Sequence, residues 1–199
     1  MADSRRKRVQ VDIRPMEIDD LSAVYHLGEG LFTSEEYPIL YRTWDAFEVT
    51  DHFTSNPEYC LVAEAAGAVV GFVLATTIEK EGTAWKKYGY LSWIGIRDDY
   101  HRSGLGRRLY RRLEHSLRQS GARMVIADTE AENEEALAFF AAMGFSVSGR
   151  HIWVGKTLRR AVKGKRPEET ALTPPPRRPT QVSVVHGVPP ARKSPAAEA

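Results

Sequence analysis

The chain has 199 residues, of which 42% are hydrophobic, and a formal net charge of +2. This composition predicts one domain of about 150 residues with extensions, and the small net charge gives no support for a domain that binds nucleic acid or acidic surfaces. No apolar run approaches the roughly 18 residues of a membrane helix and no apolar signal core follows the charged N-terminus, so we expect a cytoplasmic protein without membrane contact.

The N-terminal part of the sequence predicts a strand followed by two helices. Residues 1–8 are polar and basic, and we expect them to be disordered, whereas residues 9–13 alternate like an edge strand. A helix begins at Asp19, because apolar side chains then recur at three- and four-residue spacing. A loop over residues 31–37 leads to a second, aromatic-rich helix that opens at Pro38. This helix–loop–helix fits either plain core or one wall of a substrate cleft.

Two runs with strand periodicity predict a hairpin. Residues 59–65 and 69–78 flank the turn residues Ala66 and Gly67. The only cysteine, Cys60, lies in the first run, so no intrachain disulfide is possible. We expect a buried thiol rather than part of a metal cluster.

A glycine turn is the feature around which the chain is organised. The turn Tyr100-His101-Arg102-Ser103-Gly104-Leu105-Gly106 follows an apolar strand over residues 88–96 and precedes a basic amphipathic helix over residues 105–119. Glycines two apart let the backbone approach a ligand, and a helix N-terminus directs N–H groups at it. Taken alone, the turn fits either a phosphate socket or ordinary turn chemistry. A second buried strand over residues 124–129 completes a strand–helix–strand unit and predicts a parallel pair.

A capped helix and a strand pair close the predicted domain. Asn133 caps a helix that has acidic residues in its first turn and ends at Gly144. Strands over residues 145–148 and 152–158 follow, which gives a domain over residues 9–158.

The remainder, residues 159–199, is rich in proline and basic residues and cannot bury a core, so we expect a disordered tail. The tail either has no specific role or contacts RNA, a membrane or a partner. A basic nucleic-acid-binding arm is one function that it would support.

Two motifs and the strand order together resemble the GNAT superfamily of acyl-CoA N-acyltransferases. The first motif is the glycine turn, and the second is Asn133-x-x-Ala136-x-x-Phe139-Phe140 with Met143-Gly144-Phe145. The chain looks most like the branch that contains bacterial protein N-terminal acetyltransferases. The resemblance implies an α/β (α+β) GNAT fold, with a central mixed, mostly antiparallel sheet of six to seven strands, a splayed parallel pair and about four flanking helices.

The same resemblance implies acetyl-CoA as co-substrate, bound between the splayed strands, and no metal. The backbone of Ile94, Gly95 and Ile96 would pair with the pantetheine amides. Asn133 and Phe140 occupy family positions that contact the cofactor, although Asn133 also fits a helix cap. The pyrophosphate would lie against Arg102, Ser103, Gly104, Leu105, Gly106 and Arg107.

Two positions depart from the family pattern. His101 stands where the family usually has Gln or Arg. Phe140 stands where the family often has a general-acid tyrosine, and it has no proton to give. Water or another hydroxyl, such as that of Tyr88 or Tyr90, remains as a donor to the leaving sulfur.

The general base is expected among the carboxylates near the second parallel strand. Counting back from Asn133 puts Asp128 where N-terminal acetyltransferases often carry a glutamate, and Glu130 follows on the same strand face. Glu79 and Glu35 are further candidates. That Asp128 only holds a loop or an arginine is equally open.

We therefore expect an N-acetyltransferase that moves the acetyl group of acetyl-CoA to a primary amine, which is a protein N-terminus, a lysine or a small amine. The transfer is expected to be direct, in a ternary complex, within a monomer or homodimer. The alternative is an acetyl-CoA-binding sensor or interaction module that has lost turnover, which Phe140 favours.

Overall fold

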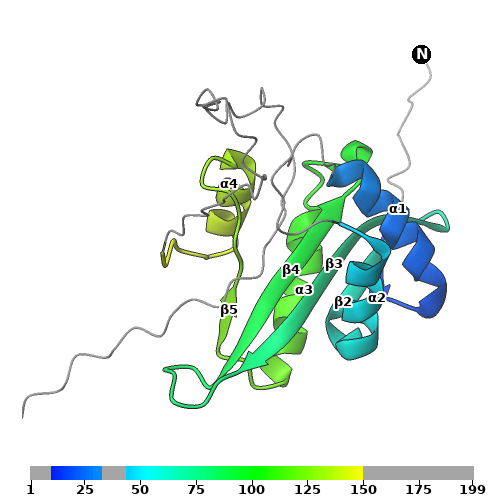
Figure 1. The fold of residues 1–199 in the computed structure, drawn as a ribbon. Coiled ribbons are helices and arrows are strands. Elements are labelled where there is room, and N and C mark those ends of the chain that lie inside the picture. Colours follow the sequence, from blue (N-terminus) through cyan, green and yellow to red (C-terminus); the bar gives the residue numbers. More distant parts are fainter. Residues whose placement is uncertain (1–9, 33–43, 150–199) are drawn as a thin grey trace, which may run out of the picture.

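The computed structural model describes residues 10–32 and 44–149, and these form a five-stranded sheet in the order β1-β2-β3-β4-β5 (Figure 1). The first three strand contacts are antiparallel and the last, between β4 and β5, is parallel. The expected mixed, mostly antiparallel sheet is thereby confirmed, with five strands among the described residues instead of six to seven. The strands are β1 Val11–Pro15, β2 Cys60–Ala65, β3 Ala68–Glu79, β4 Lys87–Ile96 and β5 Met124–Ile126.

The helices cover both faces of the sheet (Figure 1). Helices α1 and α2 pack on one face and α3 on the other, which makes a three-layer arrangement. The predicted set of about four helices is confirmed. They are α1 Leu21–Leu31, α2 Ala46–Ser55, α3 Leu105–Gln119 and α4 Glu134–Ala142.

An apolar layer fills each side of the sheet. On the α3 side, the leucines at four-residue spacing in α3 are all buried against the sheet. On the α1 and α2 side, four aromatic rings pack together, with the Trp44 and Trp93 centroids 5.1 Å apart. The other two rings are Phe32 and Phe72.

Several helices and strands begin or end at other residues than the sequence predicts. The second helix begins at Ala46, because the Asp45 side chain accepts the Glu48 N–H at 2.9 Å and caps it. Strand β5 ends at Ile126 instead of residue 129 and is only half-buried, because the chain leaves β4 there. Residues 145–148 are irregular instead of a strand. The predicted loop with Glu35 and Glu36, the helix start at Pro38, the strand over 152–158, and the segments 1–8 and 159–199 lie outside the described residues.

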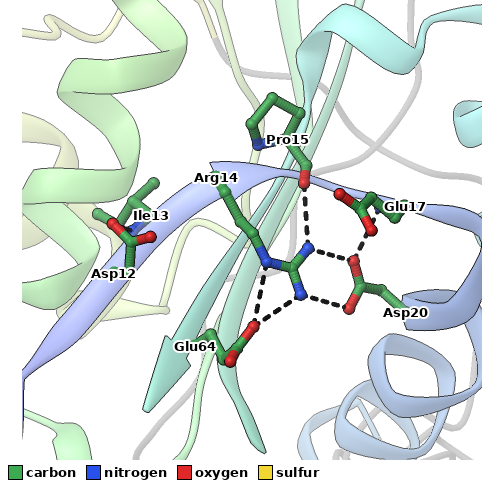
Figure 2. Close-up of polar contacts among 7 residues, drawn as sticks. All are labelled: Asp12, Ile13, Arg14, Pro15, Glu17, Asp20 and Glu64. Atoms are coloured by element: carbon green, nitrogen blue, oxygen red, sulfur yellow. Dashed lines mark hydrogen bonds and ion pairs between the residues drawn. The ribbon is translucent and has the colours of Figure 1, made fainter. Parts of the chain in front are cut away.

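An arginine with two carboxylate partners ties the edge of the sheet to the start of α1 (Figure 2). Arg14 in β1 donates to both carboxylate oxygens of Asp20, at 2.6 and 2.9 Å, and to Glu64 Oε2 in β2 at 2.8 and 3.1 Å. Asp20 is buried, and it also accepts the Glu17 N–H at 2.8 Å. The hydrogen bonds from Arg14 lower the pKa of the Asp20 carboxyl below its usual value. This cluster fixes how the chain passes from β1 into α1.

Candidate active site

Strands β4 and β5 form a fork. Three residue pairs join them, from Tyr88–Met124 to Tyr90–Ile126. Beyond these pairs β4 runs on to Ile96, and Figure 1 shows the two chain segments moving apart toward α4. We call the residues beyond the last pair, 91–96 and 127–130, the fork.

Backbone polar groups of β4 face the open side of the fork. The Arg97 N–H donates to the Val70 carbonyl oxygen at 2.9 Å. Together with the residue pairing of β3 and β4, this bond shows which residues of β4 direct their backbone polar groups at β3. Because the direction alternates along a strand, the N–H and C=O of Gly95 point toward β3, whereas those of Ile94 and Ile96 point away from it. A ligand that carries amide groups can pair with these two residues as an added strand does.

Gly95 contributes close packing. A Cβ atom on this residue would lie 2.8 Å from atoms of both Leu31 and Phe72. The expectation that the Gly95 backbone pairs with the cofactor is not supported, because the ladder directs its polar groups to β3.

The glycine turn presents unpaired N–H groups at the start of α3. Gly104 has a φ of +81°, and the chain turns there into the helix. The Leu105 N–H lies 3.3 Å from Ser103 Oγ. Other N–H groups have no acceptor among the described residues, namely those of Gly104, Gly106 and Arg107. Such donors at a helix N-terminus suit a diphosphate.

The two glycines of the turn differ in what surrounds them. A Cβ on Gly104 would meet nothing within 4 Å, so the space above this residue is open. A Cβ on Gly106 would lie 3.3 Å from Phe139 Cε2 in α4. Gly104 therefore leaves the approach to the N–H groups clear, and Gly106 lets α3 and α4 pack closely.

The arginines of the turn lie in different settings. Arg102 is exposed and has a φ of +57°. Arg107 donates to the Ala142 carbonyl oxygen at 3.4 Å, at the end of α4. These positions leave the Arg102 side chain on the surface of the turn, while Arg107 links α3 to α4.

His101 connects the turn to the end of β4. Its Nε2 lies 2.8 Å from the Ile96 carbonyl oxygen, so this nitrogen carries the proton and donates. The substitution of the usual Gln or Arg thus supplies a donor to the strand that borders the fork.

A family model for the acetyltransferase (GNAT) family matches residues 22–145, which contain the fork, the glycine turn and α4. The chain belongs to this family. It is therefore an acetyl-CoA-dependent N-acetyltransferase, and the resemblance of its motifs to GNAT enzymes is confirmed.

Individual relatives are distant. Acetyltransferase SG1711 of Sodalis glossinidius (strain morsitans) is 24% identical over 150 residues, which cover 74% of this chain and 96% of that protein. N-alpha-acetyltransferase 30 of Schizosaccharomyces pombe is 27% identical over 89 residues, 45% of this chain and 58% of that protein. Aminoglycoside N-acetyltransferase AAC(6')-Iy in complex with CoA has a TM-score of 0.61 and 21% identity, covering 76% of this chain and 97% of its own. This last likeness shows the GNAT fold.

The second GNAT motif is built into α4. The Asn133 side chain accepts the Ala136 N–H at 3.0 Å, so it caps the helix as the sequence predicts. Phe140 is buried, with its ring centroid 5.1 Å from that of Phe145. Its phenyl ring belongs to the apolar layer between α3 and α4.

The first candidate base, Asp128, lies at the fork and is joined to β4. The Tyr90 hydroxyl donates to Asp128 Oδ1. Sequence reasoning proposed Tyr90 only as a proton donor to sulfur and missed this bond. No local pattern indicates this bond, which follows from the strand register that places Tyr90 opposite Ile126, two residues before Asp128.

The other candidate carboxylates are placed differently. Glu130 is exposed. Glu79 lies at the far end of β3, where its carboxylate is 3.2 Å from Lys87 Nζ. Glu35 lies outside the described residues. Of the described candidates, only Asp128 and Glu130 belong to the fork.

Cys60 is unsuited to form an acyl-enzyme intermediate. It is fully buried, and its thiol donates to the Asn56 carbonyl oxygen at 3.4 Å. Burial raises the pKa of this thiol to about 12, so very little thiolate forms near neutral pH.

Residues 10–32 and 44–149 offer neither a candidate metal site nor a membrane-spanning helix. This part of the chain holds no group of three or more His, Cys, Asp or Glu side chains that could bind a metal ion. None of its helices is long and apolar enough to cross a membrane.

Proposed function

We propose that the protein transfers the acetyl group of acetyl-CoA to a primary amine by direct attack in a ternary complex at the fork. The observation that carries this proposal is the Tyr90–Asp128 hydrogen bond, which holds a carboxylate where the two strands separate. Asp128 is the general base, and Glu130 is the second candidate.

Acetyl-CoA fits the polar groups that the fork and the turn leave unpaired. The pantetheine amides pair with the N–H and C=O of Ile94 and with the N–H of Ile96, whose carbonyl oxygen already accepts from His101. The pyrophosphate lies over Gly104 and accepts the N–H groups at the start of α3, with the Arg102 side chain adding attraction. Asn133 and Phe140 border the cofactor from α4.

The chemistry needs a neutral amine and a tolerable leaving group. Removing the proton of an N-terminal amine at pH 7 costs roughly 1 kcal/mol, whereas a lysine costs roughly 4.6 kcal/mol. A carboxylate base such as Asp128 therefore serves an N-terminal amine more easily than a lysine. A thiol with a pKa near 8.5 leaves as thiolate at a cost of about 2 kcal/mol, so Phe140 does not prevent turnover.

We propose that the acceptor is cationic and approaches along α2. A surface hollow of about 510 Å³ follows this helix and includes Asp45, Glu48, Asp51 and the exposed ring of Phe47. Glu48 also accepts the Trp93 indole N–H at 2.9 Å, which joins α2 to the β4 residue next to Ile94. An amine that binds to this acidic face is linked to β4 through the Glu48–Trp93 contact.

Replacement of Asp128 tests the proposal. The acetylation rate is measured between pH 6 and 9 with labelled acetyl-CoA and a panel of N-terminal peptides, lysine peptides and small amines, with products identified by mass spectrometry. Asp128→Asn should lower kcat/KM by about 100-fold or more, most strongly at low pH where the amine is protonated, with unchanged affinity for acetyl-CoA. Glu130→Gln is measured in parallel, because it tests the second candidate base.

An unchanged pH profile in Asp128→Asn would remove Asp128 from the mechanism. Tight binding of acetyl-CoA by the wild-type protein without any acetylated product would instead support the alternative function, an acetyl-CoA-binding sensor or interaction module that has lost turnover.

A further inference from the structure

Two buried hydroxyl groups at the fork have no hydrogen-bond partner among the described residues. They are Ser92 Oγ on β4 and Thr129 Oγ1 on the chain that follows β5. Ser92 is fully buried and is the extra residue of a β-bulge, since Leu74 pairs with Trp93 and Ala75 pairs with Leu91. The bulge therefore lies at the start of the fork.

Such groups call for an explanation, because a buried hydroxyl without a partner is costly and uncommon in native proteins. The other buried polar side chains in the described part of the chain have partners. Asp20 accepts from Arg14, and His52 Nδ1 lies 2.8 Å from the Glu48 carbonyl oxygen.

The positions of the two hydroxyl groups coincide with the proposed site. Ser92 is two residues beyond Tyr90 on one side of the fork, and Thr129 follows Asp128 on the other side. The Tyr90–Asp128 bond thus joins the same two segments of the chain that carry the unpartnered hydroxyl groups. A polar ligand at the start of the fork would supply acceptors that these segments lack.

We propose that the hydroxyl groups of Ser92 and Thr129 donate hydrogen bonds to the thioester of acetyl-CoA. This inference rests on the proposed function. The carbonyl oxygen gains negative charge as the amine attacks, and the sulfur gains it as the carbon–sulfur bond breaks, so donors fixed at these atoms stabilise the transition state. The hydroxyl protons stay on Ser92 and Thr129. The amine proton goes to Asp128 and then to water, and the sulfur leaves as thiolate.

This arrangement explains how the chain functions with Phe140 in α4. The ring has no proton to donate, and hydroxyl donors on the fork itself take over the stabilisation of the leaving group. Ser92 and Thr129 are binding residues for the acetyl end of the cofactor, separate from the turn that binds the pyrophosphate.

The test compares two cofactor ligands by calorimetry in the absence of an acceptor. Acetyl-CoA carries the thioester carbonyl, whereas S-ethyl-coenzyme A replaces it with a methylene group. The variants are Ser92→Ala, Thr129→Val and the double variant, with Thr77→Val on β3 as a matched control away from the fork. The melting temperature of each free variant is measured beside its affinity.

The double variant should bind acetyl-CoA about 10-fold more weakly and bind S-ethyl-coenzyme A as the wild type does. Its kcat should fall by about 100-fold, while its melting temperature stays the same or rises because two unsatisfied hydroxyl groups are gone. Thr77→Val should change neither affinity.

Wild-type affinity for acetyl-CoA and wild-type kcat in the double variant would overturn the inference. Equal losses of affinity for both ligands would also overturn it, because they would show a general disturbance of the site. A wild-type protein that binds acetyl-CoA and acetylates no amine would refute the proposed function and leave the calorimetric comparison valid.

Discussion

The Tyr90 hydroxyl donates a hydrogen bond to the Asp128 carboxylate, and this bond spans the fork just beyond the last residue pair of β4 and β5. The position of the carboxylate thus depends on a side chain from the opposite strand. In the proposed mechanism, the strand that holds the cofactor also orients the base.

Loss of the Tyr90 hydroxyl should reduce catalysis through Asp128. Tyr90→Phe keeps the ring and should lower kcat by about 10-fold, with unchanged acetyl-CoA affinity. Tyr88→Phe, two pairs earlier on β4, is the matched control and should retain activity. In an Asp128→Asn background Tyr90→Phe should have no further effect, because the two residues act as a unit. Equal losses in both backgrounds would show that Tyr90 acts independently of Asp128.

Gly104 and Gly82 allow backbone strain to be separated from cofactor binding. Both have positive φ angles, +81° and +76°, and a Cβ on either would meet nothing within 4 Å. Gly104→Val and Gly82→Val should each lose about 1–2 kcal/mol of stability, measured by thermal unfolding. Only Gly104→Val should weaken acetyl-CoA binding in calorimetry, since its side chain covers the free N–H groups. Normal affinity in this variant would refute the phosphate socket.

Two glycines of α1 should respond in opposite directions to the same substitution. A Cβ on Gly28 would lie 2.1 Å from the Trp44 ring, whereas a Cβ on Gly30 would meet nothing within 4 Å. Gly28→Ala should therefore cost about 2 kcal/mol of stability or more through overpacking. Gly30→Ala should gain up to about 1 kcal/mol from helix propensity. Denaturant unfolding measures the stability of both variants. Wild-type stability of Gly28→Ala would contradict the packing of Trp44 on α1.

Acid should weaken the tie between β1 and α1. Because Arg14 lowers the pKa of Asp20 in the folded protein, this stabilisation is fully present above the unfolded value of about 3.9 and is lost as the pH falls through the folded value. Asp20→Asn should cost about 2 kcal/mol at pH 7 and flatten the decline in stability below pH 4. Arg118→Gln removes an exposed pair with Glu114 and should cost under about 0.5 kcal/mol. If the stability of Asp20→Asn and of the wild type declined in parallel as the pH falls, the Arg14–Asp20 pair would not contribute to acid sensitivity.

Local sequence signals predicted much of the fold. Helix α3 has the predicted bounds, since its leucine spacing and the flanking glycines are encoded within one segment. The Asn133 cap was also predicted, because its acceptor and donor are only three residues apart. The hairpin turn at Ala66 and Gly67 is present, with φ angles of +51° and +77°.

Features that depend on distant segments were not predicted. The length of β5 follows from where the chain leaves β4, and no residue of β5 itself signals this. The bulge at Ser92 and the ion-pair cluster of Arg14 likewise need partners from other strands. The candidate site was predicted as a set of positions, while its internal contacts, such as Tyr90 with Asp128, required the sheet register.

The contact between Trp44 and Trp93 makes the core an optical probe. The two indole rings are buried and meet at an interplanar angle of 79°. Trp93 precedes Ile94, one of the residues at the open edge of the fork, so its emission is sensitive to what occupies that edge. Intrinsic fluorescence can thus follow the arrival of a cofactor without any added label.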